Sequence, residues 1–107
     1  GRAAVAAHAE FDAVLTPTLA QLPRPIGWFS SVSPAENFER QKWYIPYAAL
    51  YNVTGQPAMS LPSQWTADGL PVGIQIVGRP AGEGSLLSLA GQFERAQPWA
   101  HRRPPTW

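Results

Sequence analysis

Apolar residues at helical spacing predict a helix near the end of the chain. Four of them fall at offsets 0, 3, 4 and 7, which places them on one helix face. They are Leu86, Leu89, Ala90 and Phe93. Residues 82–85 open this helix, and Pro98 ends it because proline cannot continue the backbone hydrogen bonding.

A second helix is predicted to begin at Ser33. Ser33 is a good N-cap, Pro34 suits the first helical position, and Glu36 stands where a capping box places its acid. The aromatic residues of this helix are the expected buried positions. They are Phe38, Trp43 or Tyr44.

A third helical segment is predicted at residues 47–53. Pro46 separates it from the helix before it, and Gly55 is the expected stop because glycine adopts the left-handed conformation freely. The side chain of Asn52 is expected to hydrogen-bond the backbone at this end. The alanine-rich residues 2–11 indicate the last turns of one more helix.

Three short apolar runs predict strands, at residues 13–16, 58–62 and 72–77. The second and third runs are joined through Asp68-Gly69, a dipeptide typical of hairpin turns. They are therefore expected to pair, and Gly73 leaves room for close backbone approach. Helices alternating with strands predict an α/β fold that spans residues 1–107 as one segment.

The long stretch between Pro17 and Pro34 lacks a helix or strand pattern but carries the aromatic pair Trp28-Phe29. A disordered linker seldom carries such residues, so we expect an ordered loop that packs on its surroundings. The nearby Ser30-Ser31 has no glycine-rich loop or base beside it. Lys42 follows Glu39 and Arg40 on the predicted helix, where a solvated face is expected. No catalytic residues are therefore assigned in this chain.

Composition and charge exclude further classes of function. The chain has 107 residues, a formal net charge of +1 and no cysteine. We expect no binding to nucleic acid or anionic lipid, because both require clustered Lys and Arg. We also expect no membrane segment, because no apolar run approaches the roughly 20 residues that span a bilayer. His8 and His101 stand apart near the two ends and are expected at the surface, so we expect neither a metal nor another cofactor. The lack of cysteine favours a cytoplasmic location.

Three segments in order resemble motifs of the amidase signature family. Residues 11–18 follow the pattern F-D-x-x-L-T-P-T, and residues 52–62 follow N-x-T-G-x-P-A-x-S-x-P. Residues 69–80 are similar to the G-L-P-V-G-x-Q-x-x-G segment that comes next. Because the chain starts with Gly1 rather than Met, it is expected to be a processed product, an engineered piece or part of a longer protein.

The resemblance implies a mixed, twisted β-sheet flanked by helices, of which this piece would supply a few strands and two to three helices. Family members hydrolyse carboxylic amides with a Ser–cis-Ser–Lys triad that lies upstream of the motifs seen here. The chain thus resembles the C-terminal quarter of such an enzyme and is expected to be inactive alone. Its expected partners are the remainder of the amidase chain and a small amide substrate.

Within the intact enzyme, residues 27–31 and 52–55 are expected to approach the substrate cleft. Trp28, Phe29 and Asn52 would then shape its leaving-group or acyl side. Two other hypotheses for the chain stay open. It could be a separate non-catalytic subunit, or an unrelated small α/β binding module that uses the aromatic loop. Homo-oligomer formation is also left open.

Overall fold

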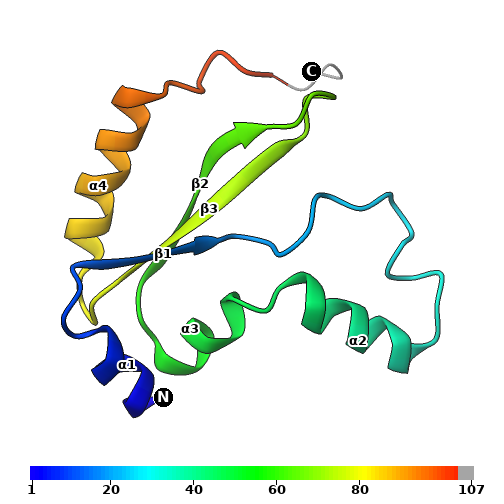
Figure 1. Ribbon diagram of the computed structural model, residues 1–107, viewed down its shortest axis with the longest axis horizontal. Helices are drawn as coiled ribbons and strands as arrows, with labels where there is room; N and C mark the ends of the chain where they lie inside the picture. Colours follow the sequence, from blue (N-terminus) through cyan, green and yellow to red (C-terminus); the bar gives the residue numbers. More distant parts are fainter. Residues whose placement is uncertain (104–107) are drawn as a thin grey trace.

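The computed structural model describes residues 1–103 and places four helices around one small sheet (Figure 1). The helices are α1 (Arg2–His8), α2 (Pro34–Tyr44), α3 (Ala48–Thr54) and α4 (Glu83–Ala96). The strands are β1 (Ala13–Pro17), β2 (Ala58–Trp65) and β3 (Pro71–Gly78). The α/β class is confirmed, with four helices in the described chain rather than two to three.

The sheet has the order β1-β3-β2, and both pairs of strands are antiparallel. The predicted hairpin is confirmed as β2 and β3. At its turn, the Gly69 amide donates to the Thr66 carbonyl at 2.9 Å, and Gly69 has a φ of 84°. This left-handed conformation explains why glycine follows aspartate at the turn.

Strand β2 continues past Pro62, beyond the predicted end of the strand, as far as Trp65. The pairing with β3 shifts between Pro62 and Gln64. Because β2 lies at the edge of the described sheet, a proline without an N–H group is tolerated in it. The sequence predicts an earlier end for this strand because it does not show that β2 lies at the edge of the sheet.

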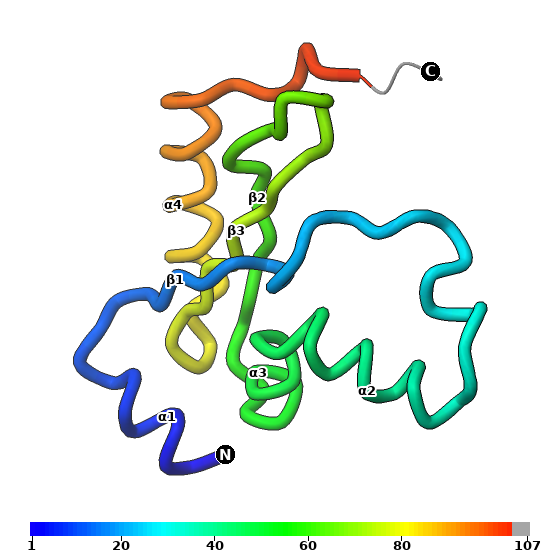
Figure 2. Tube along the Cα trace, turned by 45° about the vertical axis from the view of Figure 1, so that its right-hand side comes forward, coloured from blue at the N-terminus to red at the C-terminus, as the bar shows by residue number. Residues whose placement is uncertain are grey.

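Helix α4 covers one face of the sheet and forms the core with it (Figure 2). Leu86 of α4 is buried together with Leu61 of β2 and Ile76 of β3. Partly buried residues surround these three. They are Ala13, Met59, Ile74, Leu89, Ala90, Phe93 and Trp99. The predicted apolar stripe of α4 is therefore confirmed as the packing face.

Gly73 permits a close approach of the chain that leaves β1. A Cβ atom at Gly73 would lie 2.8 Å from the hydroxyl oxygen of Thr18. Thr18 in turn hydrogen-bonds the hydroxyl of Ser60 at 2.8 Å. The expectation that this glycine leaves room for close approach is confirmed.

Helix α2 begins as predicted but is not buried as predicted. The Ser33 hydroxyl accepts the backbone amide of Glu36 at 3.3 Å, which confirms the cap. However, no residue of α2 is buried: Phe38 is 64% exposed and Trp43 70% exposed, while Tyr44 is half-buried. The expected burial is wrong for Phe38 and Trp43, and only partly met by Tyr44, because α2 packs on the aromatic loop rather than on the sheet (Figure 1).

Helix α3 ends at Gly55, which has a φ of 69° and confirms the predicted left-handed stop. The backbone contact at this end comes from Thr54 rather than from Asn52. The Thr54 hydroxyl donates to the Tyr51 carbonyl and accepts the Gln56 amide, both at 3.4 Å. Asn52 is exposed.

Candidate functional site

The aromatic loop, residues 25–31, is an ordered double turn. The Trp28 amide donates to the Pro25 carbonyl at 3.1 Å, and the Ser31 amide donates to the Gly27 carbonyl at 2.9 Å. Gly27 has a φ of 91°, which other residues rarely adopt. The prediction of an ordered loop that packs on its surroundings is confirmed.

Three rings form the apolar part of the site. Phe29 lies edge-on to Trp28, with centroids 4.8 Å apart, and edge-on to Tyr44 of α2, with centroids 5.2 Å apart. Edge-to-face contact places the positive ring edge on the negative ring face, which makes such pairs favourable. All three side chains are half-buried, so each keeps some surface available for contact with another molecule.

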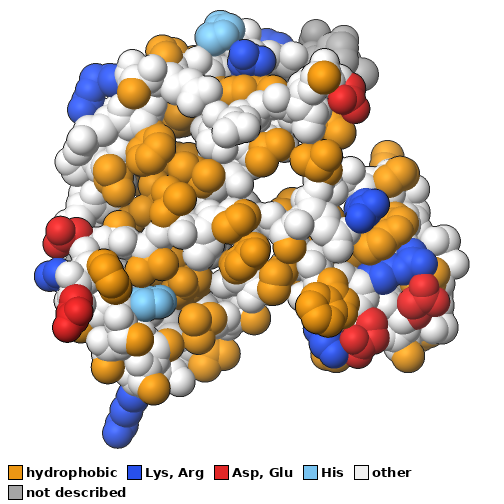
Figure 3. All heavy atoms as spheres, in the orientation of Figure 1, with side chains coloured by type: hydrophobic (Ala, Val, Ile, Leu, Met, Phe, Trp, Pro, Cys, Tyr) orange, Lys and Arg blue, Asp and Glu red, His pale blue; other side chains and the backbone are white. Residues whose placement is uncertain are grey.

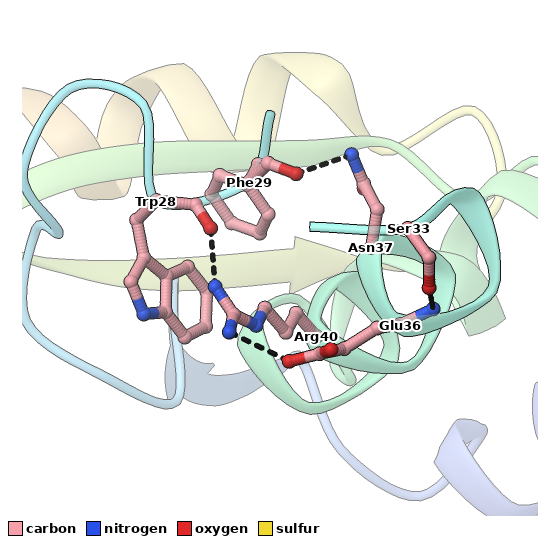
Figure 4. A network of polar contacts seen from close by, with 6 residues as sticks. All are labelled: Trp28, Phe29, Ser33, Glu36, Asn37 and Arg40. Carbon is pink, nitrogen blue, oxygen red and sulfur yellow. Dashed lines mark hydrogen bonds and ion pairs between the residues drawn. The ribbon is translucent and has the colours of Figure 1, made fainter. Parts of the chain in front are cut away.

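Two side chains of α2 hold the backbone of the aromatic loop (Figure 4). The guanidinium of Arg40 donates to the carbonyl of Trp28, and the amide nitrogen of Asn37 donates to the carbonyl of Phe29 at 2.7 Å. Asn37 and Arg40 are three residues apart, so they share one face of the helix. Two consecutive carbonyls of the loop are thereby fixed to one helix turn.

Arg40 also faces the indole of Trp28, with its guanidinium carbon 4.6 Å from the ring centroid. Its other nitrogen pairs with the Glu36 carboxylate at 2.6 Å. A second guanidinium, that of Arg24, lies 5.1 Å from the same ring centroid. Both distances fall within the range of cation–π attraction, so Trp28 is restrained by its side chain as well as by its backbone.

Ser30 and Lys42, the residues near this cluster that could take part in nucleophilic or acid–base chemistry by type, are both engaged in other contacts. The hydroxyl of Ser30 donates to the Gly27 carbonyl at 3.4 Å. The ammonium of Lys42 lies 2.8 Å from both carboxylate oxygens of Glu39, in an exposed ion pair. The expectation that Lys42 lies on a solvated face is confirmed.

The structure brings Trp28 and Phe29 together, whereas Asn52 lies elsewhere. Helix α3, which carries Asn52, lies between α1 and α2, away from the aromatic loop (Figures 1 and 2). A substrate role for each of the three residues stays a prediction.

Sequence reasoning missed Asn37, Arg40 and Tyr44 as parts of the site. Arg40 was assigned to the solvated face, yet it is half-buried against the loop. The spacing of Asn37 and Arg40 on one helix face was the only available signal, and it does not identify a partner.

Within residues 1–103, no three acidic or histidine side chains gather in a group that could hold a metal ion. No helix in this part of the chain is long and apolar enough to cross a membrane.

Comparison with known proteins gives the family. The family model described as Amidase matches residues 2–87. The protein AmiB2 of Mycobacterium tuberculosis, which carries an amidase name, is 43% identical over 95 residues. That match covers 89% of this chain and 21% of AmiB2. AmiC of Mycobacterium leprae, also named for an amidase, is 39% identical over 86% of this chain and 20% of its own length.

A solved structure is similar in fold as well. The structure of 6-aminohexanoate cyclic dimer hydrolase superposes with a TM-score of 0.72 and 31% identity. The match covers 89% of this chain and 21% of the hydrolase. The chain thus spans about a fifth of the length of the relatives it matches. With a family model that matches most of its residues, the chain is a member of the amidase signature family.

Proposed function

We propose that this chain is the C-terminal part of an amidohydrolase that hydrolyses carboxylic amide C–N bonds. The observation that carries the proposal is the match of 89% of this chain to about a fifth of 6-aminohexanoate cyclic dimer hydrolase, in sequence and in fold. The larger remaining part would hold the Ser–cis-Ser–Lys triad. This piece would then supply scaffold and one wall of the cleft, and it would be inactive alone.

The exposed apolar surface supports a partner of this kind (Figure 3). Ile26 is fully exposed, and Phe38, Trp43 and Val53 are each more than half exposed. Side chains of this size favour burial, since each gains about 1.5–3 kcal/mol when it leaves water. We propose that the remainder of the amidase chain covers these exposed side chains. We also propose that the whole enzyme is cytoplasmic.

Within that enzyme, we assign the aromatic loop to the substrate wall, with a small amide as the substrate. Trp28 and Phe29 offer half-buried ring surface, and their backbone is fixed by Asn37 and Arg40. A fixed apolar wall favours binding because little conformational freedom is lost when a substrate arrives. Asn52 is assigned a separate polar contact at the cleft, on α3.

The test uses the intact protein that carries these 107 residues and a panel of amides that differ in the size of the acyl and leaving groups. Trp28→Ala should change the ratio of kcat/KM between bulky and small amides by about 10-fold or more, as expected for loss of one apolar contact. Trp43→Ala is the matched control, because Trp43 lies outside the aromatic cluster. That variant should leave the ratio unchanged.

The two parts of the proposal fail separately. If the intact protein hydrolyses no amide of the panel, the amidase assignment is wrong. If it hydrolyses amides but Trp28→Ala and Trp43→Ala give the same ratio as the parent, only the role of the aromatic loop is wrong.

A further inference from the structure

A small cavity, partly open to solvent beside the exposed residues Ala9, Arg79 and Pro80, lies where α1 meets the connection between α3 and β2. Its volume is about 120 Å³. Residues from three separate segments line it. They are Val5, His8, Ala9, Gln56, Arg79 and Pro80. The aromatic loop does not contribute to it, so the inference below stands independently of the proposed function.

One wall of this cavity is Gln56, which is only 7% exposed. Its side-chain nitrogen donates to the Gly78 carbonyl at 3.0 Å, and this bond fixes which way the amide group is turned. The amide oxygen is buried and has no hydrogen-bond partner among the described residues. A glutamine oxygen can only accept, so the missing partner must be a donor.

His8, in the last turn of α1, also lines the cavity. Its Nδ1 atom is also buried and without a hydrogen-bond partner in the described chain. The imidazole ring packs beside the ring of Tyr51, with centroids 6.0 Å apart. The expectation that His8 lies at the surface is therefore wrong: tertiary packing of α1 on α3 half-buries it.

Arg79 also lines the cavity, but its guanidinium is engaged elsewhere. Its Nε donates to the carbonyl of Phe11 at 3.0 Å, and its Nη2 lies 3.3 Å from the carboxylate of Asp12. These contacts hold the segment between α1 and β1. They leave the buried atoms of His8 and Gln56 to be satisfied by something else.

We infer that this cavity is a binding site for an ordered water molecule that joins α1 to the α3–β2 connection. The water donates one hydrogen bond to Gln56 Oε1 and forms a second with His8 Nδ1. A buried polar group without a partner costs free energy comparable with a lost hydrogen bond, and buried waters commonly fill this need. A water molecule needs roughly 10–15 Å³ of such space, so the cavity is ample.

The first test is a high-resolution crystal structure of the intact protein. We expect an isolated density peak within about 2.7–3.2 Å of both Gln56 Oε1 and His8 Nδ1. Density continuous with a side chain from another part of the protein would overturn the inference. So would a direct hydrogen bond between His8 and Gln56.

The second test measures coupling through the water, with a double-mutant cycle of His8→Phe and Gln56→Met. Once either hydrogen-bond partner is lost, the water is bound less tightly. The second substitution should then lower the free energy of unfolding by less than it does alone. We expect non-additivity of about twofold or more in the unfolding equilibrium constant.

The matched control cycle pairs His8→Phe with Gln75→Met, because Gln75 is a buried glutamine of β3 that does not line this cavity. That cycle should be additive. Additivity in both cycles would overturn the inference, and the crystal structure decides the matter if Gln56→Met does not fold.

Discussion

At the scale of single residues, the turn from β3 into α4 gives two nearby glycines different roles. The amide of Gly82 donates to the Arg79 carbonyl at 2.9 Å, which draws the turn tight. A Cβ at Gly82 would therefore lie 2.8 Å from that same carbonyl oxygen. A Cβ at Gly84 would meet nothing within 4 Å. Both positions read alike in the sequence, as glycines at the start of a helix.

The pair Gly82→Ala and Gly84→Ala tests this difference. Gly82→Ala should lower the free energy of unfolding by about 1–3 kcal/mol, since it forces a side chain against backbone. Gly84→Ala should raise it by up to about 1 kcal/mol through better helix propensity. Urea unfolding of the intact protein measures both values. Equal tolerance of the two substitutions would contradict the tight turn.

At the scale of elements, two helices meet their neighbours in different ways. Helix α4 buries Leu86 against the sheet, so its contact is apolar and continuous with the core. Helix α2 buries no residue and instead holds the aromatic loop through the side chains of Asn37 and Arg40. The first helix stabilises the fold, and the second fixes the geometry of a surface loop.

Adjacent leucines of α4 separate core packing from surface exposure. Leu86 is 4% exposed and Leu87 is 63% exposed. Leu86→Ala should cost about 2–5 kcal/mol of unfolding free energy, because it removes buried methyl groups and leaves a cavity. Leu87→Ala should stay within about 0.5 kcal/mol of the parent. Thermal unfolding of the two variants checks this, and similar losses would show that α4 is not docked as described.

At the scale of the whole molecule, the described chain exposes more large apolar side chains than it buries. Its buried apolar residues are Tyr51, Leu61, Ile76, Val77 and Leu86. A surface of this kind indicates an interaction site, since single domains rarely expose extended apolar patches. The short length relative to its relatives agrees with that interpretation.

Production of the 107-residue chain on its own tests this interpretation. We expect it to self-associate, to bind a hydrophobic dye strongly and to hydrolyse no amide. Co-production with the larger part of the enzyme should restore a uniform particle and amide hydrolysis. Size-exclusion chromatography with light scattering and an amide assay provide the measurements. A stable monomer with little dye binding would instead favour a separate subunit or a small binding module.

Local signals in the sequence were sufficient for most of the elements and for the family. The Ser33 cap, the Gly55 stop, the Asp68-Gly69 turn and the apolar stripe of α4 all depend on residues a few positions apart. The family motifs are likewise short runs that are read directly. These interactions form within one turn or one hairpin, so the sequence alone determines them.

Only the tertiary structure decided which segments meet across long separations in the chain. It half-buried His8 against α3, turned Arg40 onto the Trp28 carbonyl and left Phe38 exposed. It also let β2 run through Pro62 by placing that strand at an edge. The type and spacing of residues along the chain indicate which side chains can be buried or can donate a hydrogen bond. How the elements pack then decides which partner each side chain meets. That packing is a property of the whole fold, which no local pattern contains.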